Sequence, residues 1–156
     1  MLANVLIFIG TVIIMEGITW CTHKYIMHGF LWIWHKDHHD KSSRGFFEDN
    51  DLFFLVFAIP SMTLIFLGKD SMASDIRFWI GLGIMVYGIL YLMVHDIFIH
   101  QRFKLFTRTN SPYFKALRKA HKVHHKHLNK ENGECFGMLW VPLKYFREYL
   151  SKSQSK

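Results

Sequence analysis

Histidines carry the clearest chemical signal in this sequence, because ten of the eleven fall into four closely spaced clusters. Imidazole is a common ligand of iron, zinc, copper and nickel. Ten imidazoles exceed what one ion can hold, so the spacing predicts two metal ions close together. The predicted ligands are His23, His28, His35, His38, His39, His95, His100, His121, His124 and His125.

The four clusters repeat two patterns in the same order. An HxxxxH pair, His23 and His28, precedes an HxxHH cluster at 35–39, and the two patterns recur at 95–100 and 121–125. Residues i, i+3 and i+4 share a helix face, so each HxxHH cluster is expected to direct three rings at one site. The HxxxxH partners lie about 140° apart on an α-helix. They either approach a two-metal centre from both sides or sit where the helix loosens.

Three carboxylates lie close enough in sequence to orient the histidines. A metal-bound histidine usually donates its second N–H to a carboxylate or a carbonyl. Glu16 lies in an apolar segment seven residues before His23, Asp37 lies inside the second cluster, and Asp96 follows the histidine at position 95. We expect all three to support ligands, with a surface ion pair as the alternative for Asp37. His127 lies outside the repeat and is predicted to be a surface residue.

Composition favours a membrane protein. Hydrophobic residues make up 51% of the 156 residues, and they occur in long runs. The net charge is +7, and 13 of the 19 Lys and Arg residues follow position 100. A basic tail could bind nucleic acid, but cytoplasmic segments of membrane proteins carry the same charge, so we expect no nucleic-acid partner. Cys21 and Cys135 form no CxxC motif and are expected to be free thiols, not ligands.

Three segments are predicted to span the membrane: residues 2–21, 52–67 and 76–94. The second is short and contains Pro60, so it is expected to tilt, kink or gain length at its ends. The polar turn at 68–71 joins the last two spans into a hairpin. The N-terminal run lacks the basic residues and cleavage site of a signal peptide, so it is expected to stay as a helix.

Three crossings place all four histidine clusters on one side of the membrane. The loop on the other side is neutral, so the positive-inside rule makes the histidine side cytoplasmic. The predicted fold is therefore all-α, an integral membrane protein with a cytoplasmic histidine-rich helical cap. Residues 1–150 are predicted to form one membrane-embedded domain, and residues 151–156 a disordered tail.

Six motifs resemble the bacterial β-carotene hydroxylases, which belong to the fatty-acid hydroxylase superfamily of membrane di-iron enzymes. These motifs are HKYIMHG (23–29), WHKDHH (34–39), FEDND (47–51), VHDIFIHQRF (94–103), AHKVHH (120–125) and FGMLWVP (136–142). The resemblance runs over about residues 1–145. Larger members of the superfamily often have four spans, one more than is predicted here.

The resemblance implies a reaction and its cofactors. The reaction is O2-dependent hydroxylation of carotenoid β-ionone rings at C3, with ketocarotenoids as further candidate substrates. Two iron ions would be the cofactors, and electrons would come from NAD(P)H through ferredoxin reductase and ferredoxin. Zinc cannot change oxidation state, so it can only replace iron in purified protein. The expected location is a bacterial inner membrane.

Two other functions remain open from the residues. One is hydroxylation or desaturation of another lipid, such as a fatty acid or a sterol, although the HKYIMHG and HQRF motifs favour a carotenoid. The other is metal binding or transport without catalysis. Transporters place their polar ligands near the middle of the membrane, whereas these clusters lie at the ends of spans.

Overall fold

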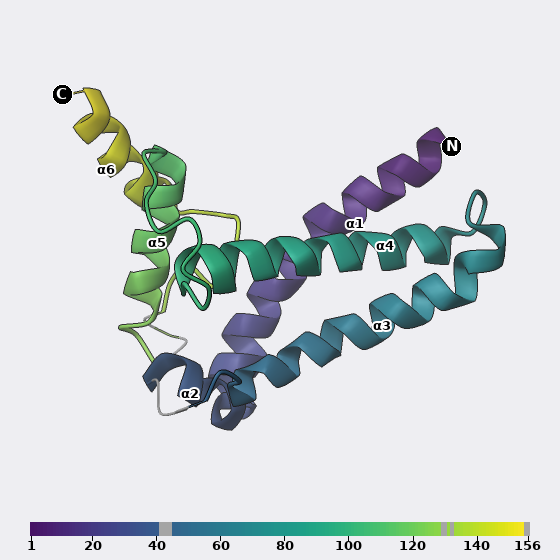
Figure 1. Ribbon diagram of the computed structural model, residues 1–156, viewed down its shortest axis with the longest axis horizontal. Coiled ribbons are helices and arrows are strands. Elements are labelled where there is room, and N and C mark those ends of the chain that lie inside the picture. The colour runs from purple at the N-terminus through teal and green to yellow at the C-terminus, as the bar shows by residue number, and fades with distance from the viewer. Residues whose placement is uncertain (41–44, 129–130, 132, 155–156) are drawn as a thin grey trace.

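The computed structural model describes residues 1–40, 45–128, 131 and 133–154, and Figure 1 shows its arrangement. All regular structure in these residues is helical, as predicted. The elements are α1 (Leu2–Cys21), η1 (Thr22–Phe30), α2 (Trp32–Asp40), η2 (Asp49–Asp51), α3 (Leu52–Gly68), η3 (Lys69–Ser71), α4 (Ile76–Tyr91), η4 (Leu92–Ile99), α5 (Pro112–His124) and α6 (Leu143–Gln154).

Three continuous helical segments are long and apolar enough to cross a membrane: Leu2–Phe30, Asp49–Ser71 and Ile76–Ile99. The three predicted spans are thus confirmed, although each helical segment is longer than its predicted core. π-helical turns extend the first and third segments, and 3₁₀ turns extend the second at both ends. The short second span therefore gains length at its ends, one of the three outcomes expected.

The spans pack through small residues. α3 and α4 form the predicted hairpin, and α4 also packs against α1 (Figure 1). A Cβ added to Gly81 would lie 2.8 Å from the carbonyl oxygen of Ser61, and one added to Gly83 would lie 2.7 Å from Cβ of Thr11. The Ser61 hydroxyl donates to the Gly81 carbonyl at 2.8 Å. Small residues let helix backbones approach closely where lipid supplies little hydrophobic driving force.

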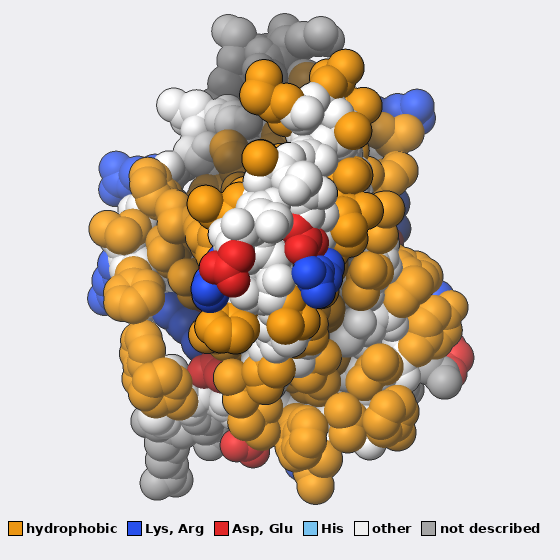
Figure 2. Space-filling model, turned by 90° about the vertical axis from the view of Figure 1, so that its right-hand side faces the viewer, with side chains coloured by type: hydrophobic (Ala, Val, Ile, Leu, Met, Phe, Trp, Pro, Cys, Tyr) orange, Lys and Arg blue, Asp and Glu red, His pale blue; other side chains and the backbone are white. Residues whose placement is uncertain are grey.

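The end of the molecule at the α3–α4 turn carries few charges. Figure 2 looks onto this end, where apolar side chains surround a small group of acidic and basic ones. Two ion pairs account for the charges of the turn: Lys69 with Asp70 and Arg77 with Asp75, each at 2.6 Å. Asp75 also caps α4 by accepting from the backbone N–H of Arg77.

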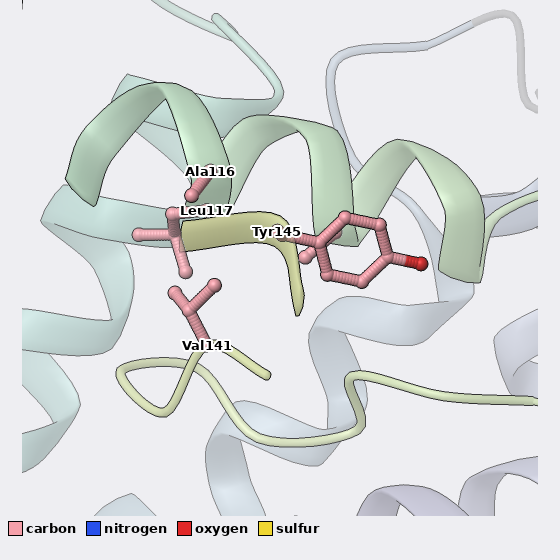
Figure 3. Close-up of a cluster of buried hydrophobic side chains, with 5 residues drawn as sticks. Ala116, Leu117, Val141 and Tyr145 are labelled. Carbon is pink, nitrogen blue, oxygen red and sulfur yellow. The ribbon is translucent and has the colours of Figure 1, made fainter. Parts of the chain in front are cut away.

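The helices α2, α5 and α6 form a cap at the other end of the spans. α5 buries Ala116, Leu117 and Ala120 against Val141 and Tyr145 (Figure 3). α5 begins with a proline at its first position, which suits a helix start because the missing N–H would be unpaired there. This small core fixes α5, and with it the last histidine cluster, over the ends of the spans.

An irregular segment at residues 134–142, which we call the strap, leads from the end of α5 toward α6. α6 starts only at residue 143 and runs to 154, into the segment predicted as a disordered tail. Residues 155–156 lie outside the described part of the chain. The tail and the single domain over 1–150 stay predictions.

Candidate metal centre

The predicted ligands converge into two groups at the cap. The ligand atoms of the first group lie within 4.8 Å of one another, and so do those of the second. The first group contains His23, His28, His35, His39 and His124, and the second contains His38, His95, His100 and His121. His125 adjoins the second group, because its Nε2 lies 2.9 Å from Nε2 of His121.

Loosened helix turns bring the two members of each HxxxxH pair together. The first pair lies within the π-helical segment η1, and the second pair joins His95 of η4 to His100, the residue that caps this π-helical segment. In such a segment the backbone bonds from residue i to i+5. The N–H of His100, for example, donates to the carbonyl of His95 at 2.8 Å. Residues five apart then share a face, and the ring centroids are 5.1 Å apart for His23 and His28. The loosened helix, not an approach from opposite sides, is the arrangement found.

Each HxxHH cluster divides its rings between the two groups. His35 and His39 of α2 join the first group and His38 the second, and His124 of α5 joins the first group while His121 joins the second. The expectation that each cluster points at one site is therefore wrong. At about 100° per residue, positions i+3 and i+4 lie on either side of position i, roughly 100° apart. A helix lying between two metal positions can thus supply histidine ligands to both of them.

The two groups are related by an approximate twofold arrangement that follows the sequence repeat. Corresponding ring-centroid distances agree: 4.8 Å for His23–His35 and 4.9 Å for His95–His121, and 4.8 Å for His28–His39 and 4.9 Å for His100–His125. The rings of His39 and His125 stack on each other at 4.3 Å between the groups. In this arrangement, His125 takes the place in the second group that His39 has in the first.

Acceptors behind the rings fix the histidine tautomers. Six Nδ1 atoms face oxygens that have no proton to give, so Nδ1–H donates and the unprotonated Nε2 is the free nitrogen of the ring. The pairs are His23 with the Phe136 carbonyl (2.9 Å), His28 with the Leu128 carbonyl (2.9 Å), His35 with Asn50 Oδ1 (2.6 Å), His38 with Glu48 Oε2 (2.7 Å), His95 with Asp96 Oδ1 (2.7 Å) and His124 with the Glu134 carbonyl (3.0 Å).

Only one of the three predicted carboxylates contacts a histidine. Asp96 accepts from His95 as expected. Asp37 instead accepts from the backbone N–H of Asp49 at 2.7 Å, so it fixes the start of the second span. Glu16 bonds to the strap and not to His23, as described below. A separation of seven residues puts Glu16 on the same face of α1 as His23 but about 10 Å from it along the helix axis. This distance explains why the predicted contact with His23 does not form.

Sequence reasoning missed Glu48 and Asn50 as partners of histidines. The acidic stretch before the second span also caps that helix, through a reciprocal capping box between Glu48 and Asp51. Arg102 supports the same turn, with Nη2 3.1 Å from Glu48 and 2.9 Å from Asp51. The acidic stretch lies in sequence on the same side of the membrane as the histidines, and this position was the signal that could have identified Glu48 and Asn50 as partners. The backbone carbonyls carry no such signal.

The donor set fits metal ions. The buried Nε2 atoms of His38 and His95 have no hydrogen-bond partner among the described residues. Elsewhere unprotonated Nε2 atoms face each other, as for His23 and His35 at 3.0 Å. Two lone pairs at this distance repel unless a cation lies between them. A metal with bonds of about 2.05 Å to nitrogen would place two ligands at right angles about 2.9 Å apart.

Burial keeps the histidines of α2 neutral. Desolvation lowers the pKa of His35 to about 2 and that of His39 to about 4, so both rings are unprotonated at neutral pH. Metal binding requires this form of imidazole. Burial raises the pKa of the Cys135 thiol to about 12, and both cysteines are free thiols, as predicted. His127 is exposed, as predicted.

An apolar cavity of about 950 Å³ lies between α1 and the strap. Its walls include Val12, Ile13, Gly17 and Trp20 from α1, and Leu139 and Trp140 from the strap. The buried ring of Phe136 packs against Trp20 of this wall, with the two ring centroids 6.2 Å apart. It also contacts the first group, with its centroid 5.5 Å from that of His23. A lipid-soluble molecule could enter this cavity from the membrane.

The chain is similar to known hydroxylases over most of its length. The fatty acid hydroxylase family model matches residues 8–143. A beta-carotene hydroxylase of Pantoea ananas is 46% identical over 139 residues, which cover 89% of this chain and 78% of the relative. A beta-carotene hydroxylase of Pseudescherichia vulneris is 44% identical over 90% of this chain and 78% of its own, and one of a Paracoccus species is 36% identical over 90% and 86%. No solved structure matches.

Because the family model covers most of the chain, and because three apolar helices carry the histidine clusters, this protein belongs to the fatty acid hydroxylase family and is a membrane hydroxylase.

Proposed function

We propose that this protein hydroxylates the β-ionone rings of carotenoids at C3, converting β-carotene through β-cryptoxanthin to zeaxanthin. The observation that carries this proposal is the pair of histidine groups in a chain whose relatives are named beta-carotene hydroxylases. Ketocarotenoids with an unmodified C3 position are further candidate substrates. Hydroxylation of another lipid is the alternative that the experiment below separates.

Two iron ions would be held by five histidines each. His23, His28, His35, His39 and His124 would hold one, and His38, His95, His100 and His121 would hold the other with His125. Bound iron supplies the redox chemistry that activates O2 for attack on an unactivated C–H bond, which zinc does not. Zinc could occupy the same nitrogens in purified protein.

The side chains around the histidines hold the ligands and exclude water. Glu48 and Asp96 keep the Nδ1 protons of His38 and His95 in place, so that the Nε2 atoms stay available. The rings of Phe136 and Trp32 cover the first group, at 5.3 Å each from the ring of His28. A site shielded in this way protects a reactive oxidant from side reactions.

The cavity beside α1 suits the substrate. Its apolar walls lie along the spanning part of α1, and its size falls in the usual range of ligand pockets. We expect the end of the carotenoid chain to occupy it, close to the first histidine group. A carotenoid held there would come from the lipid phase without crossing water.

The basic side of the molecule suits an acidic electron donor. Most of the Lys and Arg residues follow the third span, on the side of the histidines. We propose that this side is cytoplasmic in a bacterial inner membrane, and that ferredoxin delivers electrons there from NAD(P)H through its reductase. Opposite charges would speed this encounter and make it sensitive to salt.

Expression in a bacterial host that makes β-carotene tests the proposed reaction. Pigment extracts should contain β-cryptoxanthin and zeaxanthin, and extracts from a host carrying His39→Ala should contain only β-carotene. The lipid extracts of the same cells serve as the second readout. Unchanged carotenoids together with hydroxylated or desaturated fatty acids would overturn the proposal in favour of another lipid substrate.

A further inference from the structure

We infer that Glu16 is a positioning residue that holds the strap over the first histidine group. This inference rests on the proposed metal centre. Glu16 lies within an apolar span, where an ionisable side chain is costly unless it has partners. The proposed ligands of the second group are oriented by other residues, so Glu16 is expected to act on one metal position and not on the other.

The Glu16 carboxylate sits in a cradle of donors from distant parts of the chain. Its Oε1 accepts from the backbone N–H groups of Met138, Leu139 and Trp140 at 2.9, 2.8 and 2.9 Å. Its Oε2 accepts from the hydroxyl of Tyr87 on α4 at 2.7 Å. Successive peptide N–H groups that converge on one point form an anion-binding nest. Here the nest binds a side chain of the first span, which ties α1, α4 and the strap together.

The strap, in turn, orients two histidines of the first group through its carbonyls. The Phe136 carbonyl accepts from His23 at 2.9 Å, and the Glu134 carbonyl accepts from His124 at 3.0 Å. Cys135 between them has a φ of 64°, a left-handed conformation that is unfavourable for a residue with a Cβ. Such strain persists only where the surroundings enforce it. The bonds from Glu16 to the next residues of the strap supply that constraint.

The sequence of the strap fits this role at one further position. A Cβ added to Gly137 would lie only 2.6 Å from Oε1 of Glu16. Glycine therefore allows the carboxylate to approach three consecutive peptide groups. Gly137→Ala should disturb the contact between the Glu16 carboxylate and the strap by a change in the strap. It gives a second variant in which Glu16 itself is unchanged.

The second group has no contact with the strap of this kind among the described residues. His95 is oriented by Asp96, and His38 is oriented by Glu48. Loss of the Glu16 contact should therefore weaken the first metal position by about 10- to 100-fold in affinity, the usual effect of losing an outer partner of a metal-bound histidine. The second position should keep its metal.

Metal content of purified protein tests this asymmetry without any need for turnover. Each variant is loaded with ferrous iron in detergent, dialysed against a weak chelator and analysed for iron per chain. Glu16→Gln and Gly137→Ala should each fall from about two irons per chain to about one, and Asp96→Asn should also fall to about one through the other position. Asp70→Asn, a carboxylate change in the distant turn, is the matched control and should keep the wild-type content.

Combined variants identify the position that is lost. Glu16→Gln with Asp96→Asn should approach zero iron, whereas Glu16→Gln with His39→Ala should hold no less than His39→Ala alone, because both changes affect the first group. Full iron content in Glu16→Gln and Gly137→Ala would overturn the inference, and so would equal loss from both positions. If Glu16→Gln does not fold, Gly137→Ala decides alone. If the wild-type protein leaves β-carotene unchanged while the variants lose iron as expected, the proposed function is wrong and this role of Glu16 stands.

Discussion

A histidine ring has two nitrogens, and this protein fixes one of them in order to present the other. The spacing of the histidines identified the candidate ligands, although not their division into two groups, because a ligand must be a particular residue type at a particular helical position. Their partners were harder to identify. Asp96 was predictable since it adjoins His95, but the carbonyls of Phe136 and Glu134 belong to the backbone and leave no trace in the sequence.

Removing a single ligand should abolish the proposed hydroxylation. His39→Ala and His125→Ala each leave one metal position short of a nitrogen, at the place where the two rings stack between the groups. We expect no detectable zeaxanthin from either variant and less than two irons per chain. His127→Ala is the control, because His127 is exposed and lies outside both groups. Equal loss of product in His127→Ala would show that the ligand set is wrong.

At the scale of elements, the sequence predicted the three spans but left the local form of two of them open. HxxxxH is compatible with an α-helix, in which the two rings diverge, and with a π-helix, in which they converge. Intrinsic helix preferences do not separate the two forms, whereas a metal ion shared by the two rings would favour the π turn. The irregular course of the strap at 134–142 follows from contacts with Glu16, which lies 122 to 124 residues away in sequence.

Filling the cavity beside α1 should impair substrate binding and leave the metal centre intact. Gly17 lines this cavity, and a Cβ at this position meets no atom within 4 Å. Gly17→Phe should therefore fold but occupy the space assigned to the carotenoid, and we expect at least a tenfold rise in KM with unchanged iron content. Gly10→Phe is the matched control on the same helix, since Gly10 is equally open and does not line the cavity. Wild-type kinetics in Gly17→Phe would place the substrate elsewhere.

The close packing of the spans should make one glycine of α4 sensitive to substitution. A Cβ at Gly81 would lie 2.8 Å from the backbone oxygen of Ser61, which cannot rotate away. Gly81→Ala should therefore push α3 and α4 apart and destabilise the protein by about 1–3 kcal/mol. Thermal unfolding in detergent measures this as a lower Tm. Gly88→Ala, on the same helix with no atom within 4 Å of its Cβ, should unfold at or above the wild-type temperature.

At the scale of the whole molecule, an odd number of spans separates the two ends of the chain. Figure 1 shows the N-terminus at the end of the α3–α4 turn and the C-terminus at the end of the cap. Counting apolar runs was enough to predict this arrangement, because a helix in lipid must satisfy all its backbone groups internally and so leaves a long apolar run in the sequence. The pairing of the two histidine repeats around a pseudo-twofold axis needed the structure, since either HxxHH cluster could have served one site.

The charge distribution predicts which side of the membrane each end occupies. The four charged residues of the α3–α4 turn pair with each other, whereas the segment after the third span holds 13 Lys and Arg residues against three acids. From the positive-inside rule we predict that the cap lies in the cytoplasm and the N-terminus on the other side of the membrane. Green fluorescent protein fused to the C-terminus should fluoresce, and alkaline phosphatase fused there should be inactive, because the first folds in the cytoplasm and the second needs export. Reporters inserted at residues 72–74, in the α3–α4 turn, should give the opposite pair of results. An active phosphatase at the C-terminus would contradict this orientation, and with it the proposal that ferredoxin delivers electrons on the histidine side.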